Sequence, residues 1–227
     1  MKKLFKMSAV ILFVLIVFSA CGRNESVSGK ITSFPPYGER VVTAIGDSIA
    51  AGYGLDSQED NYLTLFSDNI GAVLNNDAVS GYDSGEVLKS LSDEKTAADI
   101  KNADAIVVSV GGKDFFHRKD IMIDALKNAL LHGEGFFPEE VTNIYDEYEK
   151  NLSRIIDEIK NMNPDAYIIV QTVYNPFLKQ TLNFSYINVG KTANRYVTRL
   201  NDSIKNVCKT KNRVFVFDVA PEMNEDA

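Results

Sequence analysis

The chain has 227 residues, with 24 Lys and Arg against 31 Asp and Glu, so its formal net charge is −7. Residues 1–20 hold three of the lysines and no acid; without them 21 basic residues face 31 acidic ones, and the charge is −10. Because an acidic surface without a basic stripe repels phosphate backbones, we expect no nucleic-acid partner. The 207 residues after residue 20 suit one α/β domain with a substantial core.

The N-terminus reads as a secretory signal over residues 1–20. A basic start precedes an apolar run over residues 7–18 that is too short to span a bilayer comfortably, and small residues follow. Cys21 comes directly after Ser19 and Ala20, and this resembles the lipobox of bacterial lipoproteins, in which the cysteine is acylated and becomes the first mature residue. The resemblance implies an extracytoplasmic protein that a lipid on Cys21 anchors to the cell membrane. The alternative is ordinary cleavage that leaves Cys21 as a free thiol.

Residues 21–39 are polar and rich in turn formers such as Pro35, Pro36 and Gly38, which predicts a flexible tether between the anchor and a folded body. The folded domain is therefore expected over residues 40–227. The second cysteine, Cys208, falls on the apolar face of a predicted helix and has no partner once Cys21 is acylated. We expect it to be a small core residue, and a disulfide framework is excluded.

Short apolar runs and helical patterns alternate from residue 40 onward. The predicted strands are 41–45, 77–79, 105–110, 167–172 and 214–218, and the predicted helices are 61–74, 85–91, 120–131, 139–162 and 189–209. The helix over 139–162 has the clearest pattern, because its apolar residues recur at spacings of three and four. Repeated βα units with fully apolar strands predict an α/β fold: a three-layer αβα sandwich with a five-stranded parallel sheet in flavodoxin-like order.

The first predicted strand runs directly into Gly46, Asp47 and Ser48. In a parallel sheet, ligands bind beyond the carboxyl ends of the strands. A serine at a strand-to-helix turn projects its oxygen there, and the helix N-terminus favours developing negative charge. Ser48 is therefore the candidate nucleophile. The alternative is that Asp47 or Ser48 caps the next helix, since both residue types are preferred N-caps.

Two further predicted strands end in small or polar residues, namely Ser80 and Gly81 after the second and Gly111 to Asp114 after the third. Together with the first block, this order and spacing resemble the SGNH hydrolases, also called GDSL-type esterases and lipases, over about residues 40–220. In that family the first block supplies a nucleophilic serine, the second a glycine whose N–H donates in the oxyanion hole, and the third an asparagine. The resemblance implies hydrolysis of carboxylic esters through an acyl-enzyme.

Carried over by position, the resemblance assigns Ser48 as nucleophile and the N–H groups of Ser48 and Gly81 as oxyanion donors. Lys113 stands where the family has its asparagine, and Asp47 and Asp114 support the site. An ammonium can stabilise an oxyanion, although its long stem fixes geometry less well than a short amide. The alternative is that Lys113 turns to solvent or pairs with Asp114 or Asp47.

The family completes its site with an Asp-x-x-His block after the last strand, and residues 219–227 contain no histidine. We therefore expect the domain to be incomplete at its C-terminus. A serine hydroxyl is a weak nucleophile without a base. His117 is the candidate substitute because it lies three residues beyond Asp114. His132 precedes Gly133 and is expected to mark a helix end.

The leading hypothesis is an extracytoplasmic, membrane-anchored serine esterase or lipase that hydrolyses lipid acyl esters or sugar acetyl esters. One rival is a non-catalytic surface module that binds glycans or acyl chains, and another is a truncated, inactive hydrolase. No cysteine, histidine or carboxylate cluster has the spacing of metal ligands, so neither a metal nor another cofactor is expected. We expect a monomer whose partners are a small-molecule, glycan or lipid ester and the membrane.

Overall fold

The structure is a computed structural model that describes residues 39–116, 138–176, 183–184 and 187–225. A five-stranded sheet forms its middle layer, and every neighbouring pair of strands is parallel. The strand order is β2-β1-β3-β4-β7, which confirms the predicted flavodoxin-like order. The strands are β1 (Arg40–Gly46), β2 (Ala72–Asn76), β3 (Ala105–Ser109), β4 (Tyr167–Gln171) and β7 (Val214–Phe217). β5 (Asn183–Phe184) and β6 (Ile187–Asn188) form a separate antiparallel pair.

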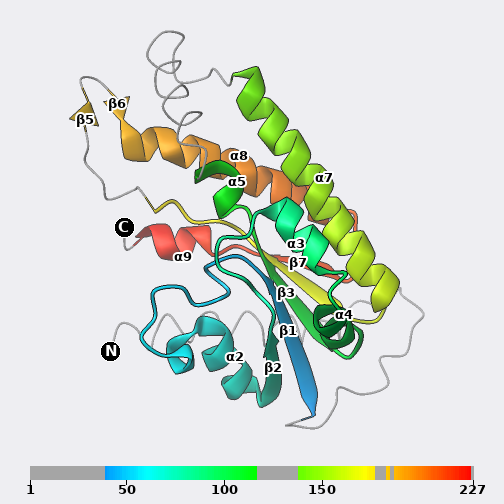
Figure 1. The fold of residues 1–227 in the computed structure, drawn as a ribbon. Coiled ribbons are helices and arrows are strands. Elements are labelled where there is room, and N and C mark those ends of the chain that lie inside the picture. Colours follow the sequence, from blue (N-terminus) through cyan, green and yellow to red (C-terminus); the bar gives the residue numbers. More distant parts are fainter. Residues whose placement is uncertain (1–38, 117–137, 177–182, 185–186, 226–227) are drawn as a thin grey trace, which may run out of the picture.

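Helices cover both faces of the sheet, as predicted (Figure 1). α2 (Tyr62–Ile70) packs on one face, where Leu63, Phe66 and Ile70 meet the strands. The opposite face carries α3 (Ser84–Ser90), α4 (Glu94–Lys101), α7 (Glu139–Met162) and α8 (Val189–Cys208). Three short helices lie in the connections and near the C-terminus: η1 (Gln58–Asp60), α5 (Gly112–Phe116) and α9 (Ala220–Glu225). The chain is thus a three-layer αβα sandwich.

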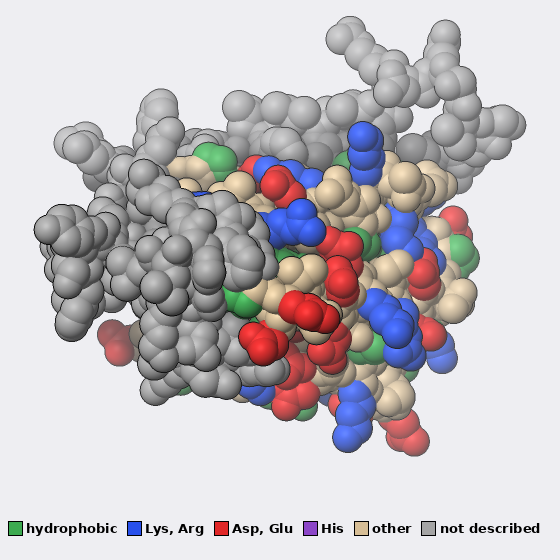
Figure 2. Space-filling view, turned by 90° about the horizontal axis from the view of Figure 1, so that it is seen from above, with side chains coloured by type: hydrophobic (Ala, Val, Ile, Leu, Met, Phe, Trp, Pro, Cys, Tyr) green, Lys and Arg blue, Asp and Glu red, His purple; other side chains and the backbone are tan. Residues whose placement is uncertain are grey.

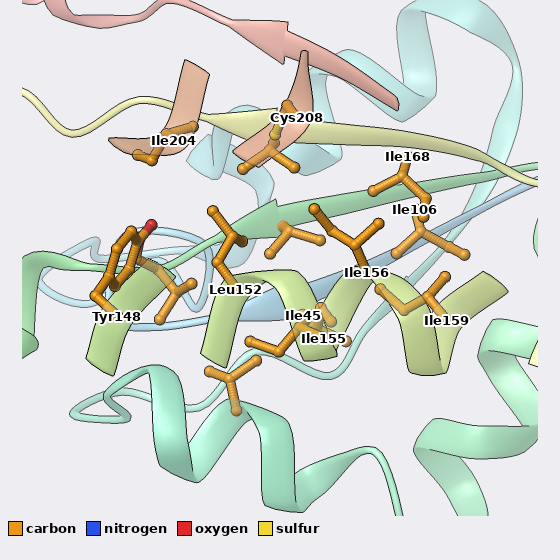
Figure 3. Close-up of a cluster of buried hydrophobic side chains, with 14 of the residues drawn as sticks. Ile45, Ile106, Tyr148, Leu152, Ile155, Ile156, Ile159, Ile168, Ile204 and Cys208 are labelled. Atoms are coloured by element: carbon orange, nitrogen blue, oxygen red, sulfur yellow. The ribbon is translucent and has the colours of Figure 1, made fainter. Parts of the chain in front are cut away.

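The central strands are buried on both sides because their alternating side chains enter two different cores. Ile106 and Ile168 point into the larger core, whereas Val107 and Ile169 point into the smaller one under α2. In the larger core α7 contributes a continuous apolar stripe that includes Leu152 and Ile156 (Figure 3). The predicted α7 has the same bounds as the observed helix, because a long amphipathic period is a strong local signal.

The predicted helix over 61–74 and the predicted strand over 77–79 are wrong in their bounds. α2 ends at Ile70, and Gly71 follows it with φ 61°, a left-handed helix cap. Residues 72–76 then form β2, so the second strand lies earlier than expected. Gly71 was the sequence signal for this boundary, since glycine just after a periodic run is typical of a helix end.

The other predicted elements fall close to the observed ones, and the predicted helix over 120–131 lies outside the described residues. The sequence patterns missed α4, because Thr96 and Ile100 are the only residues it buries. Cys208 is buried near the end of α8, which confirms it as a core residue. Cys21 and the predicted signal and tether segments up to residue 38 lie outside the described residues, so the domain boundaries stay predictions.

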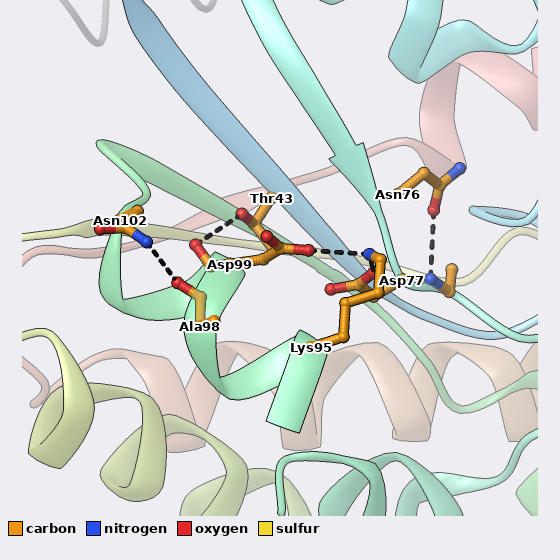
Figure 4. A network of polar contacts seen from close by, with 8 residues as sticks. Thr43, Asn76, Asp77, Lys95, Ala98, Asp99 and Asn102 are labelled. Carbon is orange, nitrogen blue, oxygen red and sulfur yellow. Dashed lines mark hydrogen bonds and ion pairs between the residues drawn. The ribbon is translucent and has the colours of Figure 1, made fainter. Parts of the chain in front are cut away.

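Charged side chains of both signs cover the described surface. In the face shown in Figure 2, acidic and basic side chains lie next to one another. One such group fixes α4 against the end of β2, where Lys95 pairs with both Asp77 and Asp99 (Figure 4). The Thr43 hydroxyl also donates to the Asp99 carbonyl, at 3.0 Å. Among the described helices, none is long and apolar enough to cross a membrane.

The packing of α7 predicts a large loss of stability when its buried stripe is truncated. Leu152 is fully buried, so Leu152→Ala should lower the free energy of unfolding by about 2–5 kcal/mol through lost transfer energy and a residual cavity. Urea denaturation measures this change. The control is Glu158→Ala on the exposed side of the same helix, which should shift the value by about 0.5 kcal/mol or less. Equal effects of the two changes would contradict this packing.

Candidate active site

The candidate site begins where β1 ends against β3. Gly46 has φ 149°, and a Cβ atom placed on it would lie 2.0 Å from the Ser109 carbonyl oxygen. Only glycine allows this approach, because any side chain would collide with backbone. The next residue then donates its N–H to the same carbonyl, with a distance of 2.8 Å from Asp47 N to Ser109 O. The two contacts fix the point where the chain leaves the sheet.

Ser48 is half-buried in a series of turns over residues 47–54. The Asp47 carboxylate accepts a hydrogen bond from the Ile49 N–H at 3.0 Å, and the Asp47 carbonyl accepts one from the Ala51 N–H. Neither Asp47 nor Ser48 caps a helix, so that alternative is wrong. The expected helix N-terminus at Ser48 is also absent, because α2 begins only at Tyr62 and is capped by the side chain of Asn61.

Two asparagines hold the turn that carries Ser48. The side-chain amides of Asn61 and Asn76 both donate to the Ala50 carbonyl, at 3.0 and 2.9 Å. Asn61 precedes α2, and Asn76 is the last residue of β2. Asn76 also accepts the Ala78 N–H, so one side chain ties the Ser48 turn to the loop after β2.

The second block follows β2 and carries Gly81. Although residues 77–79 are not a strand, the N–H groups of Asp77 and Val79 donate to the carbonyls of Ala44 and Gly46 and extend the contact with β1. Gly81 has φ 88°, a left-handed conformation that favours glycine. The family resemblance assigns an oxyanion donor to Gly81, and the backbone conformation gives a physical reason for glycine at this position.

The third block follows β3, and side chains of α7 hold it in place. The Tyr148 hydroxyl donates to the Val110 carbonyl at 3.0 Å, and its ring would lie 3.1 Å from a Cβ atom on Gly111. Asp114 accepts two bonds from Ser84, one from the hydroxyl at 2.5 Å and one from the N–H at 3.1 Å. The Asn151 side chain of α7 in turn donates to the Ser84 hydroxyl. Asp114 therefore joins the third block to α3 and α7.

Lys113 pairs with a residue that the sequence analysis did not consider. Its ammonium lies 2.7 Å from the Glu86 carboxylate on α3. The Glu86 carboxylate raises the pKa of Lys113, and the hydrogen bond from Lys113 lowers the pKa of Glu86. The pair is partly exposed, so it adds little to stability. Its consequence is geometric, because it directs the Lys113 ammonium toward α3.

All three blocks meet at one cleft of about 190 Å³ beyond the strand ends. Ser48, Gly81 and Lys113 line it together, as the sequence analysis expected for one site. Asp47 also lines the cleft, whereas Asp114 lies behind it in contact with Ser84. Gly112 of the third block also lines it, together with residues that the sequence patterns did not assign to the site: Ile49, Tyr82, Val173, Tyr174 and Pro176.

Both histidines, His117 and His132, lie outside the described residues, so neither is placed relative to Ser48. Among the residues that the structure describes, no group of three His, Cys, Asp or Glu side chains could hold a metal ion.

Asp47 is the titratable group closest in sequence to Ser48, and its side chain is almost fully buried. Burial raises its pKa to about 6, although the backbone N–H groups of Ile49 and Gly112 stabilise the carboxylate and oppose the rise. The carboxylate of Asp114 adds a smaller increase. Asp47 therefore changes charge in the weakly acidic range, next to the candidate nucleophile.

Comparison with known proteins shows the family of this chain. The model of the GDSL-like lipase/acylhydrolase family matches residues 44–227. The chain therefore belongs to this family, and family membership supports an ester hydrolase. The uncharacterized protein YpmR of Bacillus subtilis is 26% identical over 193 residues, which cover 82% of this chain and 70% of YpmR.

Two solved structures share the fold. The lipase Lip_vut3 from a goat rumen metagenome is 20% identical, with a TM-score of 0.58 over 80% of this chain and 81% of that protein. An extracellular lipase from Streptomyces rimosus is 18% identical, with a TM-score of 0.56 over 80% of this chain and 81% of that protein. These likenesses confirm the αβα architecture that the sequence predicts.

The raised pKa of Asp47 predicts a pH-dependent stability. Between pH 3.8, where an ordinary Asp titrates, and about pH 6, the folded protein keeps a proton that the unfolded chain has lost. The free energy of unfolding should therefore fall as the pH rises through this window, by about 2–3 kcal/mol from Asp47 alone.

Asp47→Asn should remove this part of the fall in the free energy of unfolding. Urea denaturation at pH 4 and pH 7 measures it, with the exposed Asp68→Asn as control. Parallel pH profiles for all three proteins would refute the assignment.

Proposed function

We propose that the chain is a serine hydrolase of carboxylic esters and that Ser48 is its nucleophile. The observation that carries the proposal is the cleft in which Ser48 and Gly81 face the same space beyond the sheet. The fixed turns around them support it, because an oxyanion site depends on donors that are already in place before the reaction. Family membership supplies the reaction class.

In this proposal the Ser48 Oγ attacks the ester carbonyl carbon while its proton passes to a base. The carbonyl oxygen becomes an oxyanion and receives hydrogen bonds from the N–H groups of Ser48 and Gly81. Collapse of this intermediate breaks the bond to the alcohol, which leaves with a proton, and an acyl-enzyme remains. Water then attacks the acyl-enzyme with the same donors in use and releases the acid. Each donor is worth about 2.7–4 kcal/mol of transition-state stabilisation.

The proton acceptor in this scheme is a histidine outside the described residues. His117 is the candidate within this sequence, because it follows Lys113 by four positions and Lys113 lines the cleft. A base must come within about 3 Å of the hydroxyl to act. Asp47 is not this base in the proposal, since its carboxylate accepts hydrogen bonds from the N–H groups of Ile49 and Gly112.

A second candidate function is a surface module that binds an ester or glycan without cleaving it. The ion pair between Lys113 and Glu86 favours this alternative, because it directs the ammonium at the family's asparagine position toward a carboxylate. The module would keep the cleft and lack the third oxyanion donor.

We further propose that the protein works outside the cytoplasm, held to the membrane by a lipid on Cys21. The support is the basic and apolar N-terminus followed by Ser19, Ala20 and Cys21. Residues 21–39 would then act as the spacer between the lipid and β1.

The proposed nucleophile predicts covalent labelling at one serine. A fluorophosphonate probe should label the wild-type protein, and Ser48→Ala should lose the label completely, because the probe traps a serine oxygen that has been activated. Ser92→Ala, at an exposed serine just after the end of α3, should label like the wild type. In-gel fluorescence and mass spectrometry of the labelled peptide measure the result. Labelling that survives Ser48→Ala would contradict the proposal, and no labelling of the wild type would favour the binding module.

The proposed anchor predicts lipid attachment at Cys21. When the gene is expressed in a bacterial host fed with radiolabelled palmitate, the wild-type protein should carry the label and sediment with membranes. Cys21→Ala should abolish the label and release most of the protein from the membrane fraction, because the proposed lipid on Cys21 provides the attachment. Cys208→Ala is the matched control and should keep the label, since Cys208 is buried. An unlabelled wild-type protein in the soluble fraction would refute the anchor.

A further inference from the structure

A second hollow of about 280 Å³ adjoins the Ser48 cleft. It lies between the Ser48 turn, α2 and the segment that leads into α9, and apolar side chains dominate its walls: Ile49, Leu65, Phe66, Val173, Val219 and Met223. Asp47, Ile49, Gly112, Val173 and Tyr174 line both hollows. The two spaces are therefore neighbours with common walls, and a ligand bonded to Ser48 can extend from one into the other.

The apolar walls of this hollow are unusually exposed. Ile49 is 45% exposed, Leu65 37% and Met223 51%, and all three contribute to the hollow. Covering apolar surface that is now in water favours binding, so an apolar ligand at this place would gain binding energy from these side chains.

The polar groups in the floor of the hollow are bonded to one another. The Tyr62 hydroxyl donates to the Gln171 side-chain oxygen at 2.8 Å. The Thr172 hydroxyl donates to the Asp218 carboxylate, also at 2.8 Å, and accepts the Val219 N–H. Because these polar groups already have hydrogen-bond partners within the protein, a ligand in the hollow does not need to supply polar atoms for them.

Asp47 is the carboxylate that lines both hollows. Because a carboxylate repels another negative charge, a fatty acid anion is a poor fit at the junction. A neutral acyl ester meets no such repulsion. The charge at the junction therefore favours an uncharged acyl group over the free acid and assists release of the acid product.

We propose that this hollow holds the acyl chain of the ester whose carbonyl carbon Ser48 attacks, so that the substrates are esters of medium-length fatty acids and not acetyl esters. The inference rests on the proposed function. An engineered cavity of about 150 Å³ holds a benzene molecule with its six carbon atoms, so this hollow of about 280 Å³ has room for roughly ten carbon atoms. An acetyl group would leave it empty, with its apolar walls still in water.

The test measures binding without turnover. Decan-1-ol is uncharged, cannot be hydrolysed and matches the proposed chain, and it should displace the apolar dye Nile red from the full-length protein, whereas ethanol should not. Leu65→Asp places a charge in the wall of the hollow and should weaken decanol binding about tenfold or more. The control is Val73→Asp, at an apolar residue of β2 that is also exposed but lies away from the hollow, and it should bind decanol like the wild type.

Nile red also binds other apolar surfaces. Only the part of the wild-type dye fluorescence that is lost in Leu65→Asp therefore reports on the hollow. Circular dichroism melting checks that each variant is folded, and Leu65→Trp, which fills the hollow without a charge, is the second variant. Equal displacement by decanol in wild type and both Leu65 variants would overturn the proposal. A dimer that dissociates with Leu65→Asp and binds no decanol would overturn it as well, because another copy of the chain would then cover the hollow.

The outcome is independent of the reactivity of Ser48. Decanol binding that depends on Leu65, in a protein that no fluorophosphonate labels, supports the acyl pocket and contradicts hydrolysis. Labelling at Ser48 in a protein that binds no decanol supports hydrolysis and overturns the pocket.

Discussion

The carboxyl end of β1 approaches the carboxyl end of β3 so closely that a single methyl group would not fit between Gly46 and the Ser109 carbonyl. This approach aligns the Asp47 N–H with the same carbonyl and turns the chain sharply out of the sheet. Ser48 owes its position at the rim of the sheet to this contact. The chemistry proposed for Ser48 therefore depends on a backbone contact between two neighbouring strands.

The remaining parts of the site are fixed by side chains that never reach the cleft. Asn61 and Asn76 hold the Ala50 carbonyl, and Tyr148 and Asn151 of α7 hold the third block through Val110 and Ser84. Asn61 caps α2 and the other three lie in β2 and α7, which limits the motion of the loops. The proposed oxyanion donors are thus backbone groups held by neighbouring elements, a property that suits electrostatic stabilisation of a transition state.

In the cleft, the positions of Ser48 and Gly81 favour catalysis, whereas the ion pair of Lys113 does not. Ser48 and Gly81 line the same cleft, while the ammonium of Lys113 is bonded to Glu86. The adjoining apolar hollow suits an acyl chain in either case, because its walls do not depend on how reactive the serine is. Binding of an acyl group and its cleavage are therefore separable properties of this fold, and they are set by different residues.

The sequence alone determined the layer architecture, the strand order, the bounds of α7 and the block from Gly46 to Ser48. These follow from periodic burial and from the local chemistry of glycine and serine, which act over a few residues. It misjudged the end of α2, because the apolar pattern continued past Gly71 into β2. The tertiary structure decided that Lys113 meets Glu86, that Asp114 meets Ser84 and that an apolar hollow adjoins Ser48. The two side-chain contacts join residues 27 and 30 positions apart, the walls of the hollow come from still more distant segments, and no local pattern encodes which distant side chain a loop will meet.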